Sequence, residues 1–537
     1  MKRRQEAGQS LVFVALTMVV LIGILGFAID FGYYRFLRRQ MQTAADAAAL
    51  AGAMDITYGD VVTAGKAASA ENGFSNGVGG ITVAISTPPT IAPWNGSATY
   101  KNYVQAVVTD NNVPTFFSKI FGATAPVLST TAVAEGGLNC IYGLDTGNGA
   151  LTLALSVVNS TCGVVDNDNL SLTLAALCAP SIQLLGHQTG IFGLSCASGF
   201  APARTVKIAS AVADPFCQTG ASCLPAPSPA ALPPKGPCSA GTYSVPPKVA
   251  TTAITQANTY TANYCGITIT GSGTAANPVK ITPGNYYGPI TITNSYVVFQ
   301  NTGGTGTTYA INSPTQPGIK LASNNLFGGS NVQFQAGTYT IAGGISDTGT
   351  FGSFINFNST AGTPNLIILD GGGLQLVGNS GASGTAGQST GGITFYNSGT
   401  AAGSCVTCYG QILSYFNFSG TFCGAGCNMS APTTGTYAGI LFFQDRNDTS
   451  VSPCFLGGSA SACFGASVGI SGPVSHTGAY YFPSGTVDFG FNFGAGAPYT
   501  YLIAKDVNWF VNFQFNSNYA SLPTSFPLRQ GAAVLVQ

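Results

Sequence analysis

The sequence predicts a mainly β protein with an N-terminal transmembrane helix, a small α/β module, and a Gly- and Asn-rich parallel β-helix. Three observations support this fold class: one uncharged apolar segment near the N-terminus, many short apolar runs, and 71 glycines among 537 residues. Charged residues make up 7% of the chain, against roughly 25% in an average soluble protein. Because aromatic residues reach 11%, the chain is expected to fold rather than to be disordered.

The N-terminal segment predicts a membrane anchor. Leu11 to Ile29 contains no charged residue, and about 20 apolar residues suffice to cross a bilayer. A secretory signal peptide is shorter and is followed closely by its cleavage site, whereas the small residues at 51–53 lie far beyond the span. We therefore expect one uncleaved helix from Gln9 to about Ala53. Its Ala-rich stalk, which carries Asp46, would let another helix pack closely.

The orientation of the anchor follows from the rest of the chain. Three basic residues lie on each side of the span, so the positive-inside rule gives no answer. Fourteen cysteines and a body with few charges favour an oxidising compartment. The N-terminus is therefore expected in the cytoplasm and the bulk of the chain outside it. Only twelve of the 18 basic residues lie beyond the anchor, which leaves no basic surface for nucleic acid.

The sequence predicts five segments, of which the anchor is the first. We expect the anchor and stalk at 1–54, a small α/β module at 55–137, a β-rich segment at 138–214, a Pro-rich linker or rim loop at 215–250, and a β-solenoid domain at 251–537. Within the module the expected elements are helices at Asp60–Asn72 and Pro114–Gly122 and strands at Ile81–Ser86, Tyr103–Thr109 and Val127–Ala134.

The β-helix prediction depends on a weak internal repeat. The triplet Gly-x-Tyr recurs at 241–243, 284–286, 337–339, 435–437 and 478–480. Apolar runs such as Val297–Asn301 and Ile393–Asn397 end in residues that can stack from coil to coil. Irregular, turn-rich coils of this kind are typical of a parallel β-helix. Two β-sandwich domains are the alternative, because short strands with Gly turns serve either fold.

The N-terminal segment also resembles a known family. The run GQSLVFVALTMVVLIGILGFAIDFGYYRFLRRQMQTAADAAALAGA, from Gly8 to Ala53, is similar to the start of TadE/TadG-like proteins of the tight-adherence (Flp) pilus-assembly system. PTFFSKIFG and LSTTAVAE extend the resemblance to about Glu135, and CIYGLD, YAGILFFQDR and GAYYFPSGTVDFG resemble segments of larger members. The resemblance implies an inner-membrane-anchored, envelope-exposed protein tied to pilus biogenesis or adherence.

Two family features do not transfer to this chain. Prepilin-like members have a Glu five residues after the cleaved Gly, and the corresponding residue after Gly8 is Phe13. The segment therefore resembles a permanent anchor and not a pilin subunit awaiting cleavage. Some members also carry a von Willebrand A domain with an Asp-x-Ser-x-Ser metal motif, and we expect neither a metal nor a cofactor here.

The carboxylates give the candidate catalytic residues. Asp445 and Asp448 flank Arg446, and Asp166 and Asp168 form a second near pair. Glycosidases use two carboxyl groups roughly 5–9.5 Å apart, so the first pair is the best site for an enzyme. Both pairs occupy turn positions, where Asp normally accepts backbone hydrogen bonds. An envelope carbohydrate-active enzyme, a polysaccharide lyase or glycosidase, is therefore the alternative function and not the first.

The cysteines and histidines point to structure more than to chemistry. The spacing of Cys405, Cys408, Cys423 and Cys427 is close to that of a zinc ribbon, although outside the cytosol two disulfides are expected instead. Cys217 with Cys223 and Cys454 with Cys463 are close enough to pair locally. Six others can pair across coils in an order left open: Cys140, Cys162, Cys178, Cys196, Cys238 and Cys265. His187 and His476 lie in no nucleophile motif and are expected at the surface or at strand ends.

Together these patterns predict a structural protein. We expect a single-pass protein of the bacterial inner membrane, with a β-solenoid that serves as an envelope scaffold or adhesion surface and performs no catalysis. The expected partners are the lipid bilayer through Leu11 to Ile29, other pilus-assembly or envelope proteins, and surface glycans.

Overall fold

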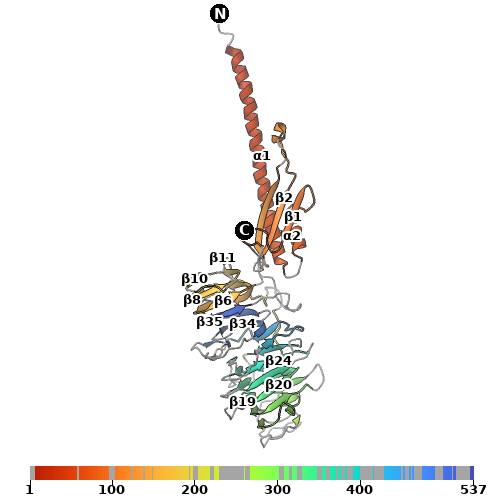
Figure 1. Cartoon of the computed structure of the whole chain (residues 1–537), viewed down its shortest axis with the longest axis vertical. Coiled ribbons are helices and arrows are strands. Elements are labelled where there is room, and N and C mark those ends of the chain that lie inside the picture. Colours follow the sequence, from red (N-terminus) through yellow and green to blue (C-terminus); the bar gives the residue numbers. More distant parts are fainter. Residues whose placement is uncertain are drawn as a thin grey trace. The chain divides into compact units, whose positions relative to one another are not determined.

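The computed structural model contains two compact units (Figure 1). Unit 1 comprises residues 1–138 and 530–537, and unit 2 comprises residues 139–529. The structure describes residues 6–56, 60–95, 103–122, 124, 126–136, 139–147, 149–192, 194–197, 204–217, 223–228, 259–260, 266–301, 307–313, 317–322, 329–347, 353–358, 363–370, 373–376, 381–383, 391–398, 415–416, 428–448, 452–453, 459–460, 462–464, 475–489, 500–510, 512–515 and 533–536. The finer division into five segments stays a prediction.

Unit 1 is built on one long helix, α1, which runs from Glu6 to Met54. Its first half exposes large apolar side chains, for example Leu21 at 64% and Phe27 at 68%. Its second half buries small ones, because Ala44, Ala45 and Ala48 are fully covered. The expected uninterrupted helix with a small-residue stalk is thereby confirmed. The change from an exposed to a buried apolar surface occurs within a single continuous helix.

A small antiparallel sheet and a second helix pack against that stalk. The elements of unit 1 after α1 are α2 (Val61–Glu71), β1 (Ile81–Ser86), β2 (Tyr103–Asp110), the 3-10 turn η2 (Ser118–Phe121), β3 (Leu128–Glu135) and β37 (Val534–Leu535). The strand order is β1-β2-β3-β37. Helix and strands agree with the expected ranges within one or two residues. The added strand β37, from the end of the chain, was not anticipated.

One expected element of unit 1 was wrong. The short helix predicted to start at Pro114 begins only at Ser118 and is a single 3-10 turn. The amides of 116–118 donate hydrogen bonds to the side chain of Asp30, which supplies the acceptor that amides at the start of a helical turn lack within the turn itself.

Unit 2 contains three stacks of parallel strands that the chain visits in rotation. The first stack holds β13 (Ile267–Thr270), β16 (Ile290–Thr293), β19 (Ile319–Ala322), β22 (Ile345–Asp347), β25 (Leu374–Leu376) and β28 (Tyr415–Phe416). The second holds β15 (Gly284–Tyr286), β18 (Thr308–Ile311), β21 (Thr338–Ala342), β24 (Asn365–Asp370), β27 (Ile393–Asn397) and β30 (Ile440–Gln444). The third holds β12 (Thr259–Tyr260), β14 (Val279–Ile281), β17 (Tyr296–Phe299), β20 (Asn331–Gln335), β23 (Phe354–Asn358) and β26 (Gly381–Ser383).

The last strands of unit 2 pair with its first ones. The later strands are β29 (Asn428–Ser430), β31 (Ser452–Pro453), β32 (Ser459–Ala460), β33 (Ala462–Phe464), β34 (Ser475–Phe489), β35 (Thr500–Trp509) and β36 (Phe513–Phe515). The early strands are β4 (Asn139–Gly143), β5 (Leu151–Ala154), β6 (Val157–Ser160), β7 (Gly163–Asp166), β8 (Leu170–Cys178), β9 (Ser181–Leu184), β10 (Gln188–Phe192) and β11 (Arg204–Lys207). Because β35 pairs with both β4 and β5, the early segment continues the parallel sheet of the late one.

The core of unit 2 consists of ladders of like side chains. Ile267, Ile290, Ile319 and Ile345 lie in register on successive strands and are buried. Phe299 and Phe334 stack with ring centroids 4.7 Å apart. Aromatic pairs of this geometry contribute about 0.5–1.5 kcal/mol beyond their buried area. Antiparallel pairing, which a β-sandwich requires, occurs among the described strands of unit 2 only between β31 and β32.

Three disulfides lie in the described part of unit 2. Cys217 pairs with Cys223, as expected from their spacing. Cys140 pairs with Cys162 and Cys178 with Cys196, which settles two of the pairings left open. The remaining cysteines lie outside the described residues, apart from Cys463 in β33: Cys238, Cys265, Cys405, Cys408, Cys423, Cys427 and Cys454.

Candidate functional site

The first candidate site is the apolar half of α1. Within the described residues this is the one helix long and apolar enough to cross a membrane, and its most apolar window is 6% buried. An exposed apolar surface of this length is unfavourable in water, since each large side chain is worth about 1.5–3 kcal/mol on burial. The surface therefore requires a bilayer or another apolar partner.

Asp30 is the first residue after the apolar segment, and its side chain makes a tertiary contact with a distant loop. Its carboxylate is 2% exposed and accepts hydrogen bonds from the amides of Phe116 (3.1 Å), Phe117 (3.1 Å) and Ser118 (2.7 Å). The hydroxyl of Ser118 donates a further bond of 2.7 Å. Hydrogen bonds to a charged acceptor are roughly twice as strong as neutral ones. Asp30 thus fixes a loop that is distant in sequence to the end of the apolar segment.

The stalk of α1 receives a helix, as expected from its small side chains. A methyl group added at Gly65 of α2 would lie 3.0 Å from the carbonyl oxygen of Ala48. Asp46 accepts a hydrogen bond from Gln42 (2.8 Å), and Gln42 also donates to the carbonyl of Thr131 in β3 (3.2 Å). The stalk is therefore an integral part of the module's core.

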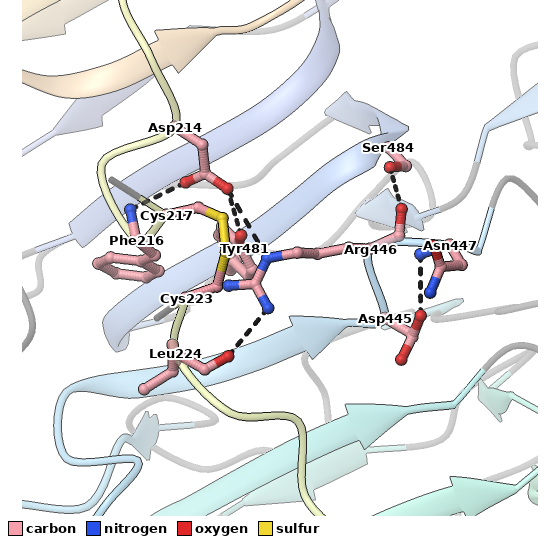
Figure 2. A network of polar contacts seen from close by, with 10 residues as sticks. All are labelled: Asp214, Phe216, Cys217, Cys223, Leu224, Asp445, Arg446, Asn447, Tyr481 and Ser484. Atoms are coloured by element: carbon pink, nitrogen blue, oxygen red, sulfur yellow. Dashed lines mark hydrogen bonds and ion pairs between the residues drawn. A yellow bond between two sulfur atoms is a disulfide. The ribbon is translucent and has the colours of Figure 1, made fainter. Parts of the chain in front are cut away.

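The sequence-predicted residue Arg446 lies in a polar cluster of unit 2 (Figure 2). Its guanidinium donates from Nη1 to the carbonyl oxygen of Leu224 (2.9 Å), and its Nε is 3.9 Å from the Asp214 carboxylate. It also lies over the Tyr481 ring, 5.1 Å from the centroid. Tyr481 donates to the same carboxylate, and Asp214 accepts from the amide of Phe216 (2.9 Å).

This arrangement is a clamp on the chain segment that contains the Cys217–Cys223 disulfide. Arg446 contacts the segment on both sides of the disulfide, at Asp214 and at Leu224. Burial raises the pKa of Asp214, while its hydrogen bonds and the Arg446 charge oppose that effect. Arg446 Nη1 and Nε and the Asp214 carboxylate therefore join neighbouring segments, whereas Arg446 Nη2 is buried without a hydrogen-bond partner among the described residues.

Asp445 and Asp448, the proposed catalytic pair, have separate structural partners. Asp445 accepts hydrogen bonds from the Tyr396 hydroxyl (2.6 Å) and from the amide of Asn447 (2.8 Å). Asp448 is 3% exposed and accepts from the Asn397 side chain (2.9 Å). These are the turn and stacking roles that Asp adopts at strand ends. The use of the pair in catalysis stays a hypothesis.

The expectation that the chain lacks the von Willebrand A metal motif was wrong at the level of sequence. Residues 448–452 read Asp-Thr-Ser-Val-Ser, which has the Asp-x-Ser-x-Ser spacing of the von Willebrand A metal motif. Residues 449–451 lie outside the described part of the chain. Within the described part, no group of three or more His, Cys, Asp and Glu side chains is placed to hold a metal ion.

The second predicted carboxylate pair, Asp166 and Asp168, lies near charged residues that the sequence did not single out: Asp145, Lys505 and Asp506. Lys505 Nζ lies 3.9 Å from Asp145 and 3.7 Å from Asp506. Burial and, to a smaller extent, the nearby Asp145 raise the pKa of Asp506 to about 6, while the charge of Lys505 opposes this rise. Burial likewise raises the pKa of Asp166 to about 7, with added repulsion from Asp168 and Asp506. No sequence motif marks this cluster, because it forms only when β35 pairs with β4 next to β7.

The two histidines differ in their environments. His187 is exposed just before β10, as expected for a strand-end residue. His476 is the second residue of β34, as expected for a strand-end histidine, but it is 1% exposed and therefore not at the surface. Its Nδ1 is hydrogen-bonded to the Tyr480 hydroxyl, and burial lowers its pKa to about 3. His476 is therefore neutral over the physiological pH range.

Unit 2 also has an uncharged polar cavity of about 350 Å³. Its lining includes seven threonines, two asparagines and Tyr437, and it contains no charged residue. The polar residues are Asn301, Thr307, Thr308, Thr338, Thr363, Asn365, Thr394, Thr434, Thr436 and Tyr437. Hydroxyl and amide groups in this setting suit a neutral ligand rich in hydroxyl groups better than an ion.

Comparison with known families gives one match. Residues 8–55 match the family described as putative Flp pilus-assembly TadE/G-like. The N-terminal region is TadE/G-like. The matched residues are those of α1 from the start of the apolar segment to the end of the stalk, which confirms the resemblance drawn from Gly8 to Ala53. No curated protein and no solved structure matches the chain. A pilus-assembly segment and a single apolar helix fit a membrane-anchored protein.

Proposed function

We propose that this protein is a membrane-anchored, envelope-exposed structural or assembly protein of the Tad (Flp) pilus type. The observation that carries the proposal is the structure of the TadE/G-like segment itself. Residues 8–55 form one helix whose first half is an exposed apolar surface and whose second half is the core of a folded module. Such a helix joins a membrane-embedded segment rigidly to a folded domain outside the membrane. Other pilus-assembly or envelope proteins are the proposed partners.

The proposed topology places the N-terminus in the cytoplasm and the rest of the chain outside the bacterial inner membrane. Disulfides at Cys140–Cys162, Cys178–Cys196 and Cys217–Cys223 support this orientation, since disulfides persist in oxidising compartments. Protease added to spheroplasts should degrade unit 2 and leave only a short N-terminal fragment protected. Full protection of unit 2 would reverse the proposed orientation.

We further propose that unit 2 is a parallel β-helix that acts as a scaffold. Every third strand pairs in parallel through β13, β16, β19 and β22, and equally through the other two stacks, which supports three strands per coil. Cysteines introduced at the in-register pair Thr291 and Lys320 should cross-link. The control pair Thr291 and Ala322, which is two residues out of register, should not. Equal cross-linking of both pairs would contradict the proposed coils.

The assembly role is tested by deletion and replacement. A strain without this protein should lose piliation or surface adhesion, and the full chain should restore it. A chain whose residues 1–29 are replaced by a cleavable signal peptide should reach the envelope but fail to restore the phenotype. Restoration by the soluble chain would show that anchoring is dispensable and would contradict the proposal.

A second candidate role is adhesion to neutral surface glycans through the uncharged polar cavity. The observation that favours it is a lining of threonine and asparagine side chains without any charge. Replacement of Tyr437 by Ala should weaken binding to a neutral polysaccharide such as dextran or a mannan at least tenfold. Tyr296, which is 38% exposed on β17, gives a matched control outside the cavity. An equal loss in both variants would argue against a site in the cavity.

We do not include catalysis in the proposal, and the enzymatic alternative has its own test. If the protein were a carbohydrate-active enzyme that uses the 445–448 pair, the purified chain should cleave an envelope polysaccharide. Asp445→Asn and Asp448→Asn should then abolish cleavage. Cleavage that both substitutions abolish would replace the scaffold proposal with the enzymatic one.

A further inference from the structure

A loop of unit 1 lies against α1 beside the apolar segment. We define the apolar loop as residues 114–122, which include η2. A methyl group added at Gly26 of α1 would lie 2.8 Å from Phe117 Cβ, so the loop contacts the helix directly. The rings of Tyr33 and Phe116 meet edge to face at 5.3 Å. With the hydrogen bonds to Asp30, these contacts fix the loop to α1 between residues 26 and 33.

The outer side of the apolar loop exposes large apolar side chains. Phe116 is 54% exposed and Ile120 is 76% exposed. Val127, just before β3, is 60% exposed. Clustered exposed apolar residues mark interaction sites with proteins or membranes.

The height of the loop along α1 favours the bilayer as its partner. The uncharged segment from Leu11 to Ile29 has nineteen residues and at a rise of 1.5 Å per residue it spans about 28 Å, close to the roughly 30 Å of a hydrocarbon core. Asp30 and the apolar loop that it binds therefore lie where the core ends. The apolar loop therefore lies beside the C-terminal end of the span and not beside a distant part of α1.

The side chains around the loop also suit the boundary between hydrocarbon and headgroups. Tyr33 and Tyr34 of α1 are partly buried at this level, and aromatic residues accumulate at membrane interfaces. Arg35, Arg38 and Arg39 follow within about three turns, and Lys119 is exposed on the loop itself. Cationic residues near a membrane surface are attracted by anionic headgroups. An apolar tip with cations beside it is complementary to an anionic bilayer.

We propose that the apolar loop inserts Phe116 and Ile120 into the bilayer interface beside α1. The protein then contacts the membrane at two places that Asp30 connects, and unit 1 cannot rotate about the helix axis or change its tilt freely. A single helix leaves both motions open, whereas a second contact off the axis restricts them. The inference rests on the proposed anchoring by α1 and adds a second, independent membrane contact to it.

The inference is tested with tryptophan probes in the full chain, reconstituted into vesicles of phosphatidylethanolamine and phosphatidylglycerol with brominated acyl chains. Ile120→Trp probes the loop and Leu21→Trp probes the span. Val62→Trp is the matched control, because Val62 is 45% exposed in the same unit. Its neighbour Val61 contacts Gly52 of α1, which is about 33 Å along the helix from Asp30. The signal of the native Trp94 and Trp509 is subtracted with the unmodified chain.

We expect brominated lipid to quench the probes at 21 and 120 at least threefold more than the probe at 62. Quenching at 21 with none at 120 would overturn the inference and leave the proposed anchoring intact. Absence of quenching at both positions would overturn the anchoring and the inference with it.

A photocrosslinking experiment separates lipid from a protein partner. A benzophenone amino acid at position 120 of the full chain, irradiated in cell membranes, should yield lipid adducts detectable by mass spectrometry. The same amino acid at position 62 should yield none. Adducts at 120 with protein only, including a second copy of this chain, would overturn the assignment to lipid.

Discussion

Replacement of Asp166 by Asn should stabilise unit 2, and the gain should depend on pH. Asp166 ends β7 and is fully buried. One carboxylate oxygen accepts from the amide of Asp168 (2.9 Å), and the other oxygen has no hydrogen-bond partner. Burial, with the neighbouring charges of Asp168 and Asp506, raises the pKa of Asp166 from 3.8 to about 7. The folded state thus favours the neutral acid.

The magnitude follows from the linkage between protonation and folding. Between the unfolded pKa of 3.8 and the folded pKa of about 7, the unfolded chain binds fewer protons than the folded chain. Stability therefore falls as the pH rises through this window. Each pKa unit corresponds to about 1.4 kcal/mol, so the loss between about pH 4 and about pH 8 amounts to roughly 4 kcal/mol. Asparagine does not ionise and avoids that loss.

Denaturant unfolding of the full chain in detergent provides the assay. A Trp94→Phe background leaves Trp509, which is fully buried in unit 2, as the fluorescent reporter. The free energy of unfolding of the Asp166→Asn chain should match that of the parent near pH 4 and exceed it by about 4 kcal/mol near pH 8. Asp60→Asn, at the start of α2 in unit 1, is the control and should leave the Trp509 transition unchanged. Equal stability of parent and variant near pH 8 would refute the reasoning.

Three further predictions concern contacts described above. Asp30→Ala should speed amide hydrogen exchange of residues 116–118 on the order of tenfold or more, whereas Asp46→Ala should leave it unchanged. Unaltered exchange in the Asp30→Ala chain would contradict the hydrogen bonds from these amides to Asp30. Arg446→Met should lower the free energy of unfolding of unit 2 by about 2 kcal/mol, and it should raise the pKa of Asp214, seen as a larger stability loss with rising pH. Gly65→Leu should destabilise unit 1 by about 1–3 kcal/mol in thermal unfolding, with Gly32→Leu as the comparison, because a side chain added at the exposed Gly32 of α1 meets no atom of the described residues within 4 Å. An equal melting temperature for parent and Gly65→Leu would mean that α2 does not pack closely on α1.

The sequence predicted the local elements well where their signals are local. The apolar segment of α1, the strands β1 and β2, and the Cys217–Cys223 disulfide each follow from a continuous stretch of chain. The expected start of a helix at Pro114 was wrong, and the residues there are held by Asp30, which lies 86 residues before Phe116 in the sequence. A local pattern does not contain a contact of that kind.

The candidate site was predicted less completely for the same reason. Arg446 was singled out by its position between two aspartates, yet its contacts are Asp214 and Leu224, the latter 222 residues away in sequence. The cluster of Asp145, Lys505 and Asp506 carries no signal in the sequence, because two distant strands supply its members. Such sites depend on strand register, which the pattern of one strand does not contain.

The sequence by itself determined the apolar segment of α1, its TadE/G-like character and the ranges of α2, β1, β2 and β3, because apolar length and periodicity are properties of one continuous stretch of chain. Only the tertiary structure decided which partner each polar group meets. Asp30 accepts from the amides of 116–118, and Arg446 forms an ion pair with Asp214. The charge of Asp506 raises the pKa of Asp166. These pairings arise when whole elements pack and fix their register, so their energies belong to contacts between segments that lie far apart in the sequence.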